Sequence, residues 1–182
     1  ALQAAVAALG MFYPGRNVKD VENNYWSAVR LIAKLPTIVA AWARLRRGDE
    51  YIPPRDDLPF SDNFLYMLTE TVPHPLWSEV FDDCLILHAE HTMNASTFAG
   101  MVTASTQADP YTVVASSIGA LKGPLHGGAN EEVVTMLREI GTPAQAHAAV
   151  EARLGGKNKL MGFGHRVYKV RDPRATVLQD LC

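Results

Sequence analysis

The spacing of apolar side chains along the chain is helical almost throughout. In the clearest case Val21, Tyr25, Val29 and Ile32 recur three or four residues apart, which places them on one face of a helix. The alternation of polar and apolar residues that marks a strand is confined to a short stretch at 166–170. The pattern therefore predicts an all-α fold, with helices over 2–11, 20–46, 63–69, 75–106, 110–121, 131–140, 143–155 and from 173 onward.

Proline and capping residues suggest how several of these helices begin or break. Pro36 should kink or split the second helix, because proline removes a backbone donor and its ring crowds the preceding turn. Ser61 is suited to cap the helix that follows an exposed, proline-rich loop. Thr142 and Gln145 have the spacing of a capping box, so we expect a helix to begin between them.

A cluster of glycines at 123–128 interrupts the helical pattern. It is the best candidate for a hinge, so we expect one unit over residues 1–122 and a second over 123–182. Residue 1 is an alanine already inside a helical pattern, and a new amphipathic pattern is only starting at the other end. We therefore expect the chain to be a piece of a longer protein.

The composition is that of a folded protein without a strong charge bias. Of the 182 residues, 48% are hydrophobic and 20% are charged, and the net charge is -2. These values exclude a disordered tail and offer no basic field for nucleic acid or anionic lipid. The two cysteines, Cys84 and Cys182, argue against a disulfide framework and for a reducing, cytoplasmic compartment. No apolar run is long enough to span a bilayer, and the chain opens without a secretory signal pattern.

The first segment with candidate chemistry carries polar side chains at helical spacing. On a helix His88 would lie beside His91, and His91 beside Asn94, because residues three or four apart share a face. Such a face could line a pocket for an anion. The two histidines could instead coordinate a metal ion together with a third ligand, or they could be hydrogen-bonded residues of the core. The segment by itself leaves these interpretations open.

His126 lies directly before two glycines and a predicted helix. Glycines let the backbone come close to a ligand, and the positive end of the following helix dipole disfavours an imidazolium. A neutral imidazole could donate a hydrogen bond to an enolate oxygen as it develops. A plain, solvated glycine-rich turn would have the same sequence, so the segment alone does not decide between them.

His165 follows another Gly-x-Gly sequence and precedes a cluster of cationic side chains. Arginine is suited to bidentate contacts with carboxylates, so this segment could hold a substrate that carries carboxylates or phosphates. A solvated basic loop is the alternative. The segment is not a dinucleotide-binding fingerprint, because no strand, turn and helix surround it. The cationic residues are Arg166, Lys169, Arg171 and Arg174.

Taken together, the three segments resemble the citrate synthase family, most closely its bacterial and archaeal members. The residues that carry the resemblance are LHAEHTMNAST (87–97), GPLHGGANEEV (123–133) and GFGHRVYKVRDPRA (162–175). Their order and spacing also fit, and the resemblance extends over the whole chain. It implies a multi-helical fold in which 1–122 is part of a large domain and 123–182 supplies active-site loops and the start of a small domain.

The resemblance also implies roles for individual side chains. In the family, the histidine of the PLHG segment stabilises the enol of acetyl-CoA, which suggests that role for His126. The histidine of the GxGH segment hydrogen-bonds the carbonyl of oxaloacetate and polarises it, which suggests that role for His165. Both are therefore implied to be catalytic, and Ser96 would orient His126.

Substrate contacts are implied in the same way. His91, with Asn94 nearby, would bind oxaloacetate, and Arg174 would bind a substrate carboxylate. The backbone before His165 is similar to the family's loop that contacts the CoA adenine, and a cation near the CoA phosphates is expected to follow it. The implied CoA-binding residues are Leu160, Gly162, Gly164 and Lys169.

The implied reaction is the condensation of acetyl-CoA with oxaloacetate to give citrate and CoA. It is an acyl transfer that needs no metal and no cofactor, since acetyl-CoA is a substrate. One alternative is 2-methylcitrate synthase, which uses propionyl-CoA; another is a non-catalytic helical domain for dimerisation or binding. The family forms homodimers through helices of the large domain, and residues 75–121 are our candidate for that surface.

The family's catalytic aspartate and further substrate arginines belong to segments that lie beyond Cys182. Asp172 is not expected to replace that aspartate, because its place before Pro173 is typical of a helix cap. We therefore expect this chain to hold only part of an active site and to show little or no turnover by itself.

Overall fold

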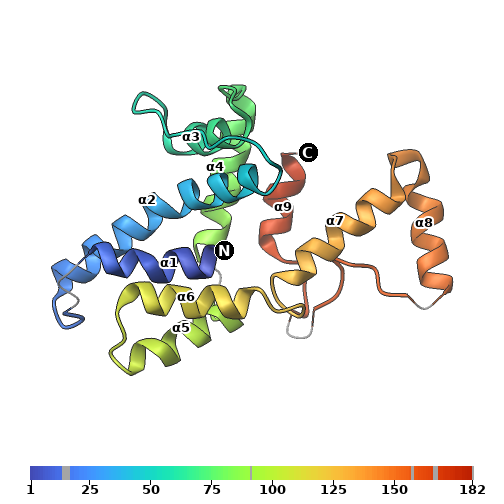
Figure 1. Cartoon of the computed structure of the whole chain (residues 1–182). Helices are drawn as coiled ribbons and strands as arrows, with labels where there is room; N and C mark the ends of the chain where they lie inside the picture. The colour runs from blue at the N-terminus through green and yellow to red at the C-terminus, as the bar shows by residue number, and fades with distance from the viewer. Residues whose placement is uncertain (14–16, 91, 157, 166–167, 182) are drawn as a thin grey trace.

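The computed structural model describes residues 1–13, 17–90, 92–156, 158–165 and 168–181. Helices are the regular secondary structure of these residues, which contain no strand, so the predicted all-α fold is confirmed (Figure 1). The helices are α1 (Leu2–Phe12), α2 (Val21–Leu45), α3 (Phe60–Thr69), α4 (Pro75–Ala89), α5 (Ala95–Ser105), α6 (Pro110–Leu121), α7 (Gly128–Ile140), α8 (Pro143–Gly155) and α9 (Pro173–Asp180).

The main core lies between α1, α2 and α6. Val6, Leu31, Tyr111 and Ala115 are buried together there, one face of each helix contributing apolar side chains at helical spacing. Helix α6 also packs along α5, and α2 also packs against α3. Contacts of this region therefore link five helices (Figure 1). The ring of Tyr111 stacks on that of Tyr13 with 5.8 Å between centroids, which joins α6 to the end of α1.

Helices α3 and α4 form a hairpin at one side of this core. Phe64 and Phe81 stack with 5.0 Å between ring centroids and hold the two helices together. Ser61 does not cap α3 as the sequence suggested, because the helix already begins at Phe60. The Ser61 side chain is buried and donates a hydrogen bond to Asp82 on α4 instead. Ser61 therefore connects two helices and does not cap its own.

The prediction of one helix over 75–106 is wrong. The chain leaves the helical conformation between α4 and α5, where Thr92 has a φ of 75°. Asn94 then caps α5, its side-chain oxygen accepting a hydrogen bond 2.9 Å from the backbone nitrogen of Thr97. An asparagine that bonds its own backbone in this way favours a new helix start over continuation of the old helix.

Two other helix features follow the sequence only in part. Helix α2 is capped by Asp20, at the predicted start, but it is not split at Pro36 and continues to Leu45. Contacts of α2 with α1, α3 and α6 hold both of its halves, so the missing backbone donor of one proline does not end it. Thr142 stands at the start of α8 as predicted; its hydroxyl bonds the side chain of Gln145, 2.9 Å away, and not a backbone amide.

Helices α7 and α8 form a second hairpin, and α9 follows after an irregular segment (Figure 1). Helix α7 begins at Gly128, three residues before the predicted start, so its first turn lies directly behind His126. Asp172 caps α9 as predicted, accepting from the backbone nitrogen of Arg174 at 3.0 Å. The division into units over 1–122 and 123–182 stays a prediction.

The chain exposes much more surface than a compact protein of its mass. Its solvent-accessible area is 13041 Å², whereas a compact monomer of this mass would expose about 8,700 Å². Large apolar side chains lie on that surface, among them Trp26, Trp77 and Phe98. None of the described helices combines the length and apolar character needed to cross a membrane.

Candidate functional site

The structure brings two predicted site residues into direct contact. Ser96 Oγ lies 2.7 Å from His126 Nε2, a hydrogen bond between residues thirty positions apart. Ser96 is in the first turn of α5, and His126 is in the turn between α6 and α7. Both side chains are half-buried, so the bond is partly shielded from water.

The turn that carries His126 is held tightly against the end of α6. The nitrogen of Gly127 donates to the carbonyl of Leu121 at 3.0 Å, and the nitrogens of His126 and Gly128 both donate to the carbonyl of Gly123. A Cβ at position 127 would lie 2.4 Å from the oxygen of Leu121, so only glycine fits there. The glycines of this segment therefore serve to bring backbone close to backbone and to present His126.

The segment before α5 is organised differently from its prediction. His88 lies in the last turn of α4, where its Nδ1 is 2.6 Å from the carbonyl oxygen of Cys84. Asn94 belongs to the start of α5, so the proposed continuous helical face from His88 to Asn94 is wrong. His91 lies outside the described residues. Among the residues that the structure describes, no three side chains of His, Cys, Asp or Glu are placed to share a metal ion.

His165 is the centre of a second cluster, in the irregular segment before α9. The backbone nitrogen of Tyr168 donates to Nδ1 of His165 at 3.2 Å, and the two rings lie 4.2 Å apart at an angle of 30°. A nitrogen that accepts a hydrogen bond carries no proton, so the neutral imidazole bears its proton on Nε2.

Arg174 lies beside this histidine cluster and is paired with Asp172. Its guanidinium contacts both carboxylate oxygens of Asp172, the shortest distance being 2.6 Å from Nη2 to Oδ2. The hydrogen bond that Arg174 donates to the Asp172 carboxylate raises the pKa of Arg174, and Tyr168 contributes in the same direction. Asp172 thus has two functions, since it caps α9 and orients the arginine that the sequence proposed for a substrate carboxylate.

The proposed CoA loop packs against α7. A Cβ at Gly162, whose φ is 86°, would lie 3.4 Å from the side chain of Val133. Leu160 is half-buried, whereas Gly164 and Lys169 are exposed to solvent. The loop and the His126 turn therefore both adjoin α7, one at its side and the other at its start.

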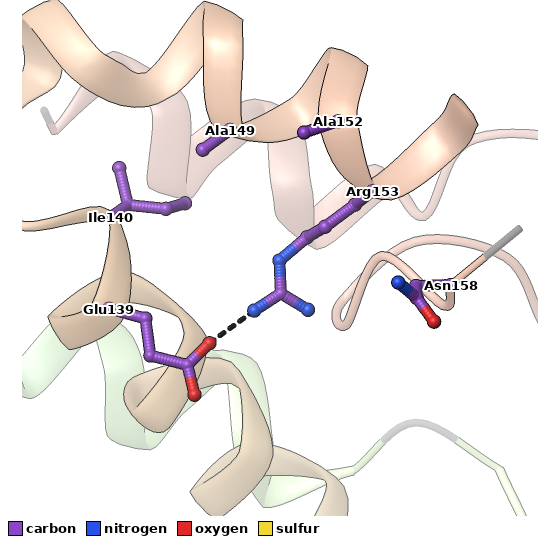
Figure 2. A pocket seen from close by; sticks show the side chains of 6 residues that line it. All are labelled: Glu139, Ile140, Ala149, Ala152, Arg153 and Asn158. Carbon is purple, nitrogen blue, oxygen red and sulfur yellow. Dashed lines mark hydrogen bonds and ion pairs between the residues drawn. The ribbon is translucent and has the colours of Figure 1, made fainter. Parts of the chain in front are cut away.

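A hollow of about 390 Å³ lies between α7 and α8, away from the two histidine clusters (Figure 2). The side chains of Arg153 and Glu139 form an ion pair that joins the two helices at one edge of this hollow. Asn158 lines it from the start of the irregular segment that leads to Leu160. None of the predicted site residues lines this hollow, so it does not enter the candidate site.

Comparison with known proteins gives a match along the entire chain. The family model described as "Citrate synthase, C-terminal domain" matches residues 1–182. The chain belongs to the citrate synthase family. Among its curated relatives, the citrate synthase of Synechocystis sp. is 59% identical over 181 residues, which are 100% of this chain and 46% of that protein. The 2-methylcitrate synthase of Mycobacterium tuberculosis is 46% identical, with 98% of this chain and 45% of that protein covered.

A solved citrate synthase has the same arrangement of helices. The ternary complex of carboxymethyl coenzyme A and oxaloacetate with the enzyme of Thermoplasma acidophilum matches with a TM-score of 0.85 and 32% identity. The match covers 97% of this chain and 46% of that one. The chain thus spans about half the length of the citrate synthases it matches.

Sequence reasoning did not find Tyr168 or the second role of Asp172. Tyr168 lies inside the segment used for the resemblance to citrate synthases, but no spacing rule links it to a histidine three residues earlier in an irregular segment. Asp172 was interpreted only as a cap. No helical spacing rule pairs an Asp with an Arg two residues later, so the sequence carried no signal for their ion pair.

Proposed function

We propose that the protein to which this chain belongs catalyses the condensation of acetyl-CoA, oxaloacetate and water to citrate and CoA. The observation that carries the proposal is the hydrogen bond of 2.7 Å between Ser96 and His126. Family membership supports it. So does the solved relative from Thermoplasma acidophilum, which holds oxaloacetate and a carboxymethyl derivative of coenzyme A.

In this proposal His126 stabilises the enolate of acetyl-CoA. When the Ser96 hydroxyl donates to Nε2, the neutral imidazole carries its proton on Nδ1. The Nδ1–H group then donates a hydrogen bond to the thioester oxygen as negative charge develops there. Since Ser96 fixes the ring and its tautomer before the substrate arrives, little reorganisation is needed during the reaction.

His165 and Arg174 act on oxaloacetate. The Nε2–H group of His165 polarises the ketone oxygen, while the contact with Tyr168 keeps that proton on Nε2. Arg174, held by Asp172, contributes its remaining N–H groups to a substrate carboxylate. His91 and Asn94 are proposed to complete the oxaloacetate site, and Leu160, Gly162, Gly164 and Lys169 to contact CoA. The reaction requires no further cofactor in this scheme.

A second candidate is 2-methylcitrate synthesis from propionyl-CoA. It is favoured by the 46% identity with the enzyme of Mycobacterium tuberculosis. The two activities share both histidines and differ by one methyl group on the thioester. A single methylene changes the preference of an apolar pocket by about 1–3 kcal/mol, so rates with the two thioesters measured side by side discriminate between them.

We also infer that the protein is a cytoplasmic homodimer. Large exposed apolar side chains support burial of this surface against further surface, supplied by the rest of the polypeptide and by a second copy. Residues 75–121 remain our candidate for that contact; Trp77 and Phe98 lie exposed within them. The free thiol of Cys84 and the absence of a cysteine framework support a reducing compartment.

The experiment that tests the proposal measures release of the CoA thiol from acetyl-CoA in the presence of oxaloacetate. It uses this chain and a longer polypeptide that continues into the segments of its relatives. The proposal predicts turnover by the longer polypeptide and a loss of about 10²–10⁴-fold in kcat for His126→Ala and for His165→Ala. His147→Ala is the matched control, because His147 is an exposed histidine on α8 whose nearest charged partner is Glu151.

Unchanged turnover of the His126→Ala variant would exclude the proposed role of that side chain. Turnover by the 182-residue chain alone would show that its own residues include a sufficient catalytic base, contrary to our expectation from the sequence.

A further inference from the structure

Helices α5 and α6 approach each other as closely as a glycine allows. Gly100 is buried on α5, and a Cβ built there would lie only 2.5 Å from Ser117 Oγ on α6. Carbon and oxygen atoms that are not bonded do not come so near, so an alanine at 100 requires that a neighbour or a helix move. Next to this contact, Thr103 Oγ1 donates to Ser116 Oγ at 2.9 Å and sets how the two helices are rotated about their axes.

Both partners of the Ser96–His126 hydrogen bond are attached to this crossing. Ser96 is four residues before Gly100, so it lies on the same face of α5, one turn closer to the helix start. His126 follows the end of α6 in a turn that is bound to Leu121 by a backbone hydrogen bond of 3.0 Å. Because this hydrogen bond closes the turn onto α6, a shift of α5 against α6 changes the distance between Ser96 Oγ and His126 Nε2.

We propose that Gly100 is a positioning residue, whose missing side chain lets α5 lie close enough to α6 for Ser96 to reach His126. The inference rests on the proposed function, in which His126 acts on the thioester. The Ser117 hydroxyl donates a hydrogen bond of 3.2 Å to the carbonyl of Val113, and rotating it away from a new methyl group would give up this bond. With the hydroxyl kept in place, a methyl group at position 100 reaches ordinary contact with Ser117 Oγ only after α5 moves by about 0.9 Å relative to α6. A hydrogen bond of 2.7 Å that is stretched by this amount lies outside the range in which such bonds form.

The direct test records the ¹⁵N and ¹H resonances of the His126 imidazole by NMR, in the wild-type chain and in variants. Gly100→Ala should move these resonances to the values of Ser96→Ala, in which the hydrogen bond cannot form. Gly100→Ala combined with Ser117→Ala should restore them, because the oxygen that meets the new methyl group is then removed. Gly119→Ala is the control on α6, since a Cβ there meets only the movable amide of Gln3.

The same variants are then assayed for CoA release in the longer polypeptide. We expect Gly100→Ala to lower kcat by the same factor as Ser96→Ala, to leave KM for oxaloacetate unchanged, and to recover with Ser117→Ala. A general loss of stability would not produce this selective pattern or this rescue.

Wild-type His126 resonances in Gly100→Ala would overturn the inference, since the Ser117 hydroxyl would then have rotated away at no cost to the site. A double variant that folds without restoring the resonances, or that fails to fold, would overturn it as well. Shifted resonances with unchanged turnover would leave the geometry standing and would count against the proposed function of His126. The two failures are therefore distinguishable.

Discussion

Residues 1–122 and 123–182 are both helical, but they bury their side chains to very different extents. In the first region Val6, Leu31 and Tyr111 form a core to which three helices contribute. In the second, Met136 is the one buried apolar side chain among the described residues. Helix α7 is amphipathic by sequence, yet among the described residues α8 is the one helix that packs closely against it. An apolar face becomes a core only where several elements enclose it, and the helical pattern alone does not supply them.

The largest difference is expected in hydrogen exchange. Backbone amides of α6 around Ala115 should exchange through global unfolding, whereas those of α8 should exchange through local opening with a free energy near zero. The reason is that α6 has buried side chains along its length, while α8 has none. Exchange rates measured by NMR or mass spectrometry provide the check. Equal protection from exchange in α6 and α8 would contradict the proposed difference in burial between residues 1–122 and 123–182.

A pair of leucine truncations gives the next largest effect. Leu31→Ala removes a side chain that is 5% exposed in the core and should lower the free energy of unfolding by about 2–5 kcal/mol. Leu154→Ala makes the same change on α8 at a side chain that is 61% exposed and should remain within about 0.5 kcal/mol of wild type. Urea denaturation of both variants measures the contrast. Similar losses would mean that α8 is covered more completely than the structure shows.

Tyr111→Phe should act in the opposite direction within the same core. Tyr111 is 1% exposed, and its buried hydroxyl has no hydrogen-bond partner among the residues that the structure describes. Such a group costs about 1–3 kcal/mol, so its removal should raise the free energy of unfolding by about 1 kcal/mol. Phenylalanine keeps the ring that stacks on Tyr13. Tyr51→Phe, at an exposed tyrosine, is the matched control in the same denaturation experiment, and a loss of stability in Tyr111→Phe would contradict the prediction.

The smallest effect is expected in the loop between α2 and α3, outside both sets of packed helices. Hydrogen bonds from Arg55 lower the pKa of Asp57 below its ordinary value. A carboxyl group with a lowered pKa stabilises the folded state above its unfolded pKa, and this contribution is lost as the pH falls through its folded pKa. Both side chains are exposed, so the change should be slight.

The stability of wild type and of Asp57→Asn, measured from neutral to acid pH, should therefore converge as the carboxyl group takes up its proton. Arg55→Gln should remove the same pH dependence, because it deletes the donor. A constant difference at all pH values would show that the ion pair does not stabilise the fold.

Local features of the fold could be predicted because their causes are close together in sequence. Asp109 and Asp172 each precede a proline, and each accepts hydrogen bonds from the first turn of its helix. The break between α4 and α5 was missed, although Asn94 followed by Ala, Ser and Thr is a recognisable start signal. The apolar pattern continues on both sides of that break, and periodicity alone therefore joined the two helices.

The candidate site was predictable to a different degree. His126 and His165 were singled out by the glycines around them and Ser96 by a resemblance, and the roles of all three stay predictions. The sequence did not reveal all of their hydrogen-bond partners. Tyr168 contacts His165 through its backbone nitrogen, a donor that any residue except proline would also provide at that position. The pairing of Arg174 with Asp172 was likewise settled only by the path of the chain into α9.

The sequence by itself determined that the chain is helical, where most helices end, and which family it belongs to. These properties depend on spacings of a few residues and on short motifs. Only the tertiary structure decided how near α5 lies to α6, and with it whether Ser96 reaches His126 at 2.7 Å. That distance depends on Gly100 and Ser117, which are far apart along the chain and meet only when two helices pack. Helical periodicity tells which face of a helix is apolar, but the distance between two faces follows from the shapes of the side chains that meet there.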